Sequence, residues 1–157
     1  MNIRGLLAGI ILFAILVTLN EGRNAQRDTN DIIVEEGDLS VFSIAVGDCL
    51  SLPDNETQFS SITATPCQEA HDAEVFHEFN ILLEEYDGNY IATLSDERCL
   101  ENFERYVGLP FVESIYYISN FAPTPESWSQ VGDRTVQCLI IGDGTTRLIG
   151  SARGARE

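Results

Sequence analysis

The pattern of apolar and polar positions divides the chain into three parts. Residues 6–19 are apolar apart from Thr18, residues 20–40 are mostly polar, and from Val41 short apolar runs alternate with turn residues. A helix over residues 2–20 would be about 28 Å long, close to the roughly 30 Å thickness of a hydrocarbon core. We therefore predict a membrane anchor over residues 1–20, a polar tether over 21–40 and a folded domain over 41–157.

Charges around the apolar run predict the orientation of the anchor. Arg4 precedes the run, and the first acidic residue, Glu21, follows it, which keeps the N-terminus in the cytoplasm. No small-x-small cleavage site follows the run, so an uncleaved signal-anchor is favoured over a cleaved signal peptide, and no cysteine stands directly after the run to carry a lipoprotein anchor. We expect a single-pass cell-membrane protein that enters the cytoplasmic membrane through residues 5–19 and carries an extracytoplasmic domain.

Periodicity within the domain predicts an α+β fold, with an antiparallel sheet packed against one main helix. The helix is expected over residues 95–108, with Ser95 as its N-cap, an apolar stripe at every third or fourth position and Gly108 as its stop. Further strands and turns are expected as follows: strands over 41–49, 59–66, 73–83 and 114–123, a loop over 84–90, a short helix over 124–132 and a β-hairpin over 134–154.

The four cysteines all follow the predicted anchor. Outside the cytoplasm disulfides form and persist, and no C-x-x-C spacing is present. Four cysteines allow three pairings. We favour Cys49–Cys67, which would join two neighbouring early segments, and Cys99–Cys138, which would join the helix to a late strand.

The charge balance limits the class of partner. With 9 basic and 25 acidic residues the net charge is −16, so nucleic acid and anionic polymers would be repelled, and no nucleic-acid partner is expected. A cationic partner or a divalent ion fits this charge.

One stretch, residues 64–79, holds Cys67 and both histidines, His71 and His77. Its C-x3-H-x5-H spacing matches no common zinc module, so we favour a disulfide with a structurally bonded His71 and predict neither a metal nor a cofactor. If residues 73–83 form a strand, His77 shares a face with Val75 and Phe79 and is a core residue.

Several motifs occur in a fixed order: VGDCL at 46–50, PCQEAHDAEVF at 66–76, Cys99 on a helix, PESWSQVGDRTVQC at 125–138 and GSARG at 150–154. This order resembles the septum formation domain family of actinobacterial exported or membrane-anchored envelope proteins, over roughly residues 41–154. The family usually has Pro where this chain has Ala70. The resemblance implies an association with cell division or the envelope and no agreed reaction.

The polar residues matching these motifs are candidates for binding. His71, Glu74 and Arg134 form either a buried polar network or a ligand-binding site. The function we favour is a membrane-anchored extracytoplasmic binding or scaffold domain, associated with septum formation or the envelope, with a protein partner. The alternative is an envelope hydrolase that uses His71 with Glu74 or Asp72, or a metal held by His71 and His77, although the sequence contains no nucleophile motif.

Overall fold

The computed structural model describes residues 24–53 and 60–157. The predicted anchor over residues 1–20 lies outside these residues. Within the described part, no helix has both the length and the apolar character needed to cross a membrane.

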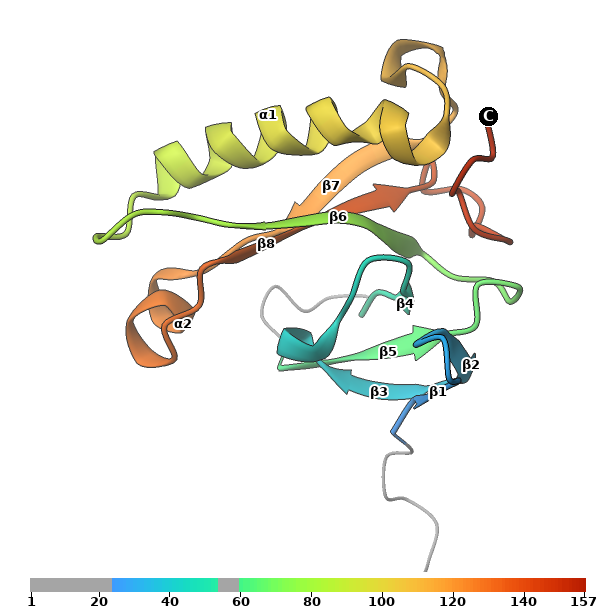
Figure 1. Cartoon of the computed structure of the whole chain (residues 1–157), viewed down its shortest axis with the longest axis horizontal. Coiled ribbons are helices and arrows are strands. Elements are labelled where there is room, and N and C mark those ends of the chain that lie inside the picture. Colours follow the sequence, from blue (N-terminus) through green and yellow to red (C-terminus); the bar gives the residue numbers. More distant parts are fainter. Residues whose placement is uncertain (1–23, 54–59) are drawn as a thin grey trace, which may run out of the picture.

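The described residues form an α+β fold with an antiparallel sheet, as predicted. The sheet has six strands in the order β3-β5-β4-β6-β8-β7, and helix α1 runs along one face of β6, β7 and β8 (Figure 1). A separate two-stranded ribbon pairs β1 with β2. The elements are β1 Gln26–Arg27, β2 Ile33–Glu35, β3 Gly37–Ser40, η1 Val41–Ser43, β4 Cys49–Ser51, β5 Ser61–Thr65, β6 Ala73–Asn80, α1 Gly88–Val107, η2 Phe111–Glu113, β7 Tyr117–Phe121, α2 Pro125–Gln130 and β8 Thr135–Ile141.

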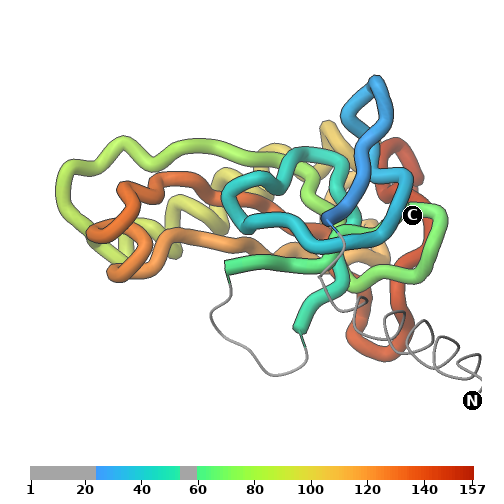
Figure 2. Tube along the Cα trace, turned by 90° about the horizontal axis from the view of Figure 1, so that it is seen from below, coloured from blue at the N-terminus to red at the C-terminus, as the bar shows by residue number. Residues whose placement is uncertain are grey.

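Apolar clusters lie on both faces of the sheet. Between α1 and the sheet, Phe76 packs edge-on against Phe103, with ring centroids 5.9 Å apart. On the other face, Leu50, Val75 and Leu139 form the centre of a second cluster. The N-terminal strands and the C-terminal segment lie at the same end of the elongated molecule (Figure 2).

Both favoured disulfides are present. Cys49–Cys67 joins β4 to the turn after β5, and Cys99–Cys138 joins α1 to β8. Cys49, Cys99 and Cys138 are fully buried, whereas Cys67 is partly exposed.

Helix α1 begins seven residues earlier than predicted. Asp87 is its N-cap and accepts hydrogen bonds from the backbone N–H groups of Asn89 and Tyr90. Ser95, the predicted N-cap, lies inside the helix, where its buried hydroxyl donates to the Ile91 carbonyl at 2.7 Å. The stop at Gly108 is confirmed, because this residue adopts the left-handed conformation (φ 83°) that glycine accommodates without strain.

The C-terminal hairpin was predicted wrongly. Only its first half is a strand, β8, which pairs with β6 and β7. The chain after residue 142 instead crosses to the start of β6, where Leu148 forms an isolated antiparallel bridge with His71. Both sides of β8 are already occupied by strands, so no returning strand can pair with it.

Part of the segment assigned to the tether packs on the domain. Residues 37–40 form β3, which pairs with β5. Arg27 makes two hydrogen bonds, of 2.7 and 2.6 Å, to the buried Asp48 carboxylate, and Ile33 is 5% exposed. These contacts attach residues 24–40 to the folded domain.

Candidate functional site

Two fully buried ionisable residues, Glu74 and His71, lie where β6 begins and the C-terminal segment crosses it. Glu74 is fully buried because it sits in the centre of the sheet, where β6 lies between β4 and β8. Its carboxylate accepts hydrogen bonds from the Tyr106 hydroxyl at 2.7 Å, the Ser151 hydroxyl at 2.5 Å and the Ala152 N–H at 2.6 Å. These three donors provide the compensation that a buried carboxylate requires.

The Glu74 carboxylate also shifts the pKa of Tyr106, whose hydroxyl donates a hydrogen bond to it. Burial, together with the negative charge of Glu74, raises the pKa of the Tyr106 hydroxyl. The guanidinium of Arg153 lies 4.4 Å from the centre of the Tyr106 ring and covers it. Tyr106 is therefore held as a neutral hydrogen-bond donor in neutral solution.

His71 is also fully buried and makes mainly structural contacts. Its backbone exchanges two hydrogen bonds with Leu148, of 3.0 and 2.8 Å, and its Nδ1 lies 2.9 Å from the Glu69 carbonyl. Its Nε2 has no hydrogen-bond partner in the described part of the chain. His71 and Glu74 thus contact the same C-terminal segment without a hydrogen bond between their side chains.

Arg134 lies elsewhere. It immediately precedes Thr135, which pairs with Asn80 six positions along β6 from Glu74, a distance of about 20 Å at 3.3 Å per residue. Its guanidinium lies 3.4 Å from the centre of the Trp128 ring and donates to the Trp128 carbonyl. The structure therefore places Arg134 in the packing of α2 and not beside His71 and Glu74.

The other two residues of the hydrolase alternative, Asp72 and His77, have their own partners. Asp72 forms an ion pair with Arg147 at 2.9 Å and accepts the Leu52 N–H at 2.9 Å. His77 stacks on Phe79, and burial and the charge of Arg105 lower the pKa of His77. Six residues of extended chain place His77 on the order of 20 Å from His71, too far to share a metal ion. This geometry gives the hydrolase alternative no support.

One group has atoms spaced as in a metal site. The sulfurs of Cys49 and Cys67 and the Glu74 carboxylate lie within 4.8 Å of one another. The two sulfurs are joined as a disulfide and therefore offer no thiolate to a metal ion. The pairing of Cys67 likewise removes it from any site with His71 and His77.

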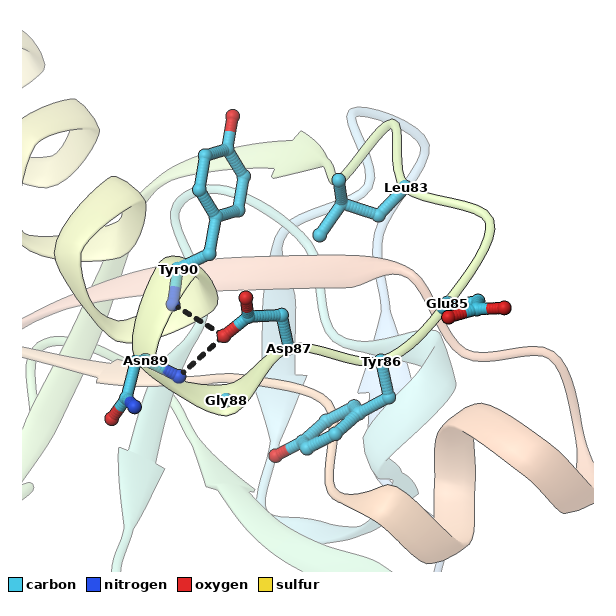
Figure 3. Close-up of a pocket in the computed structure, with 7 residues that line it drawn as sticks. All are labelled: Leu83, Glu85, Tyr86, Asp87, Gly88, Asn89 and Tyr90. Atoms are coloured by element: carbon cyan, nitrogen blue, oxygen red, sulfur yellow. Dashed lines mark hydrogen bonds between the residues drawn. The ribbon is translucent and has the colours of Figure 1, made fainter.

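A hollow of about 630 Å³ lies at the start of α1 (Figure 3). The Asp87 carboxylate in its wall is occupied by the two helical N–H groups that it caps. The Tyr86 ring packs edge-on against Trp128, with centroids 5.7 Å apart. The polar and aromatic groups of this hollow thus stabilise the helix start.

A second hollow, of about 670 Å³, lies on the sheet face away from α1, and we name it the Phe42 groove. No sequence motif indicates this groove. The available signal was Glu78, a carboxylate between His77 and Phe79 in the predicted strand. Its lining includes Val41, Phe42, Ile44, Glu78, Asp133 and Gln137.

Comparison with known families gave one match. A family model described as septum formation matches residues 46–155, more than two thirds of the chain. Comparisons with curated proteins and with solved structures gave no match.

Proposed function

Because this chain belongs to the septum formation family, we propose that it is an extracytoplasmic binding or scaffold domain, held at the outer face of the cytoplasmic membrane by an N-terminal helix. The resemblance drawn from the ordered motifs is confirmed, and with it an association with the septum or cell envelope. The anchor, the location and the binding role are the parts that we propose.

The observation that carries the proposal is the pair of disulfides within the folded domain. All four cysteines are paired, and three of them are fully buried in the packed interior. Such bonds form and persist in oxidising compartments, and cytosolic reductants oppose them. An extracytoplasmic domain satisfies this condition.

A binding role agrees with how the polar side chains are used. Glu74, Asp48 and Asp72 are all engaged by donors of the same chain. Internal pairing of this kind stabilises a rigid domain and leaves these carboxylates no free capacity for chemistry. The remaining candidates for function are surface features, which suit contact with a partner.

The anchor is supported by the sequence pattern alone. The apolar run over residues 6–19, with Arg4 before it and Glu21 after it, is typical of a signal-anchor. An anchored domain of this kind would act within reach of the membrane surface.

Reporter fusions test the location. A reporter that is active only outside the cytoplasm, fused after residue 157 of the full chain, should be active, and the chain should stay in the membrane fraction after a high-salt wash. Replacement of residues 1–22 by a cleavable signal peptide should release the domain in soluble form with both disulfides formed. An inactive reporter, or free thiols in the chain isolated from cells, would contradict the proposal.

A further inference from the structure

The Phe42 groove is lined by residues of η1, β6, α2 and β8. In Figure 1, η1 and α2 lie on the side of β6 and β8 away from α1. One wall is apolar, with Val41, Ile44 and the ring of Phe42, which is 60% exposed. An aromatic ring exposed to this degree beside a hollow is available for contact with a partner.

The floor of the groove is polar and acidic. Glu78 pairs with Gln137 across β6 and β8, so both side chains point to the same face. Glu78 is exposed, and its carboxylate forms no ion pair and accepts no hydrogen bond among the described residues. Asp133 accepts hydrogen bonds from the Ser127 hydroxyl and the Thr135 N–H, which are neutral donors and leave its charge uncompensated.

Gln137 adds a neutral acceptor to the acidic floor of the groove. Its side chain is only 7% exposed, and its amide nitrogen donates to the Val41 carbonyl at 3.4 Å. Its amide oxygen receives no hydrogen bond from any residue of the described part. This oxygen is not one of the enclosed polar atoms left without a partner among the described residues, so solvent reaches it and a donor from outside can as well.

The groove continues past Phe42. A hollow of about 630 Å³ on the other side shares Phe42 and Asp133 with it and includes Leu82 and Val131, which are 94% and 64% exposed. The only cation in this second hollow, Arg134, packs on Trp128. Together the two hollows present acidic and amide acceptors flanked by exposed apolar side chains.

We propose that the Phe42 groove binds an extended segment of a partner protein that carries a lysine or arginine between apolar residues. The basic side chain would donate to Glu78, Asp133 and the Gln137 amide oxygen, and the apolar neighbours would contact Phe42, Leu82 and Val131. The net charge of −16 adds long-range attraction for a basic segment and repels anionic wall polymers. This inference rests on the proposed binding function and specifies its partner class.

The first step of the test is selection of a partner peptide. The full chain, solubilised in detergent, is panned against a displayed library of random twelve-residue peptides. The selected peptides should contain a lysine or arginine with apolar residues on both sides. Replacing that basic residue by norleucine should weaken binding by about tenfold or more, and added salt should weaken the parent peptide's binding.

The second step locates the binding site with matched variants. Glu78→Gln and Phe42→Ala should each weaken the affinity of the best peptide by about fivefold to tenfold or more while the melting temperature is retained. Glu97→Gln removes the same charge from the exposed face of α1 and should leave the affinity unchanged.

Three results would overturn the inference: no selected peptide, selected peptides without a basic residue, or an affinity for Glu78→Gln within twofold of the parent's. The reporter fusions test location without reference to the groove. A failure of the groove and a failure of the extracytoplasmic assignment are therefore distinguishable.

Discussion

At the scale of single residues, Glu74 has the most demanding environment. A buried carboxylate is tolerated only while its donors hold their positions, and Glu74 has three of them. Two come from residues 151 and 152, more than 70 positions away along the chain. Glu74 therefore fixes the C-terminal segment to the centre of the sheet.

We predict that Glu74→Ala lowers the free energy of unfolding by about 3 kcal/mol or more, because it leaves the buried Ala152 N–H without an acceptor and opens a cavity. Glu74→Gln should cost less, about 1–3 kcal/mol, since its amide oxygen still accepts one donor. Urea unfolding with the disulfides intact measures both. Exposed Glu97→Gln is the control, and a loss below 1 kcal/mol in Glu74→Ala would contradict the assignment.

Tyr106 makes the free energy of unfolding depend on pH in the alkaline range. Burial and the charge of Glu74 raise its pKa above the value of about 10 expected in the unfolded chain. The folded state then retains a proton that the unfolded state loses, so the stabilisation is fully present below pH 10 and is lost as the pH rises above it. The expected slope is about 1.4 kcal/mol per pH unit for this group.

Urea unfolding at intervals between pH 9 and 11 checks this slope. Tyr106→Phe should remove the contribution of this residue and leave that of Tyr116, whose pKa is also raised by burial and by Glu157. Tyr117→Phe, at an exposed ring, should keep the parent slope. Identical slopes in the parent and Tyr106→Phe would show that the hydroxyl is not held as described.

At the scale of elements, the start of α1 depends on one carboxylate. Asp87→Ala should lower the free energy of unfolding by about 1 kcal/mol, because the N–H groups of Asn89 and Tyr90 lose their acceptor. Asp87→Ser should retain most of the stability, since a hydroxyl also caps. Thermal unfolding measures the loss, and an equal loss in Asp96→Ala, on the exposed face of the helix, would disprove a capping role.

The two disulfides should differ in their resistance to reductant. Cys67 is partly exposed, whereas both sulfurs of Cys99–Cys138 are buried between α1 and β8. A thiolate must reach a sulfur to open the bond, so mild reductant should open Cys49–Cys67 first.

Alkylation with two labels, followed by peptide mass analysis, reports the order of opening. In denaturant, where all sulfurs are accessible, the difference between the two bonds should disappear. Opening of Cys99–Cys138 first in the folded protein would contradict the order predicted from burial.

Several elements were predictable because local signals and packing agree. Thr124 caps α2 and Pro125 begins it, and Gly108 ends α1, as their sequence positions indicate. The start of α1 was missed because Asp87-Gly88-Asn89 is also a strong turn signal, and the packing of Ile91 with Trp128 in one cluster adds to the Asp87 cap in favouring a helix there.

Strand β6 shows another limit of pattern analysis. Its pairing with β8 shifts between Val75 and His77, so an irregularity places Phe76 against α1 and Val75 in the cluster on the opposite face. His77 and Phe79 share a face, as predicted, but Val75 does not share it. The sequence shows only the alternation of apolar and polar residues. It does not show where one strand has an extra residue, and beyond that residue each side chain lies on the opposite face from the one that simple alternation predicts.

At the scale of the whole molecule, the domain extends to residue 24. A chain that begins at residue 41 would lack β3 and would leave Asp48 buried without the Arg27 guanidinium. We predict that residues 41–157 are less stable than residues 24–157 by about 3 kcal/mol or more, because a buried charge loses its partner and the sheet loses a strand. Thermal unfolding of both chains tests this.

The variant Arg27→Met in the longer chain distinguishes the stability contributed by the ion pair with Asp48 from that contributed by strand β3. This variant should lose part of the stability that the shorter chain loses. Equal melting temperatures for the two chain lengths would mean that residues 24–40 are a tether after all.

The crossing of the C-terminal segment over β6 also determines when folding is completed. Glu74 acquires its N–H donor only from residue 152, and Leu148 joins His71 across 77 positions. During synthesis, residues 71–74 emerge long before the residues that form their hydrogen-bond partners. If the domain is exported as we propose, it cannot close until residue 152 has left the export channel, and the chain then crosses the membrane before its fold is complete, as passage through a narrow channel requires.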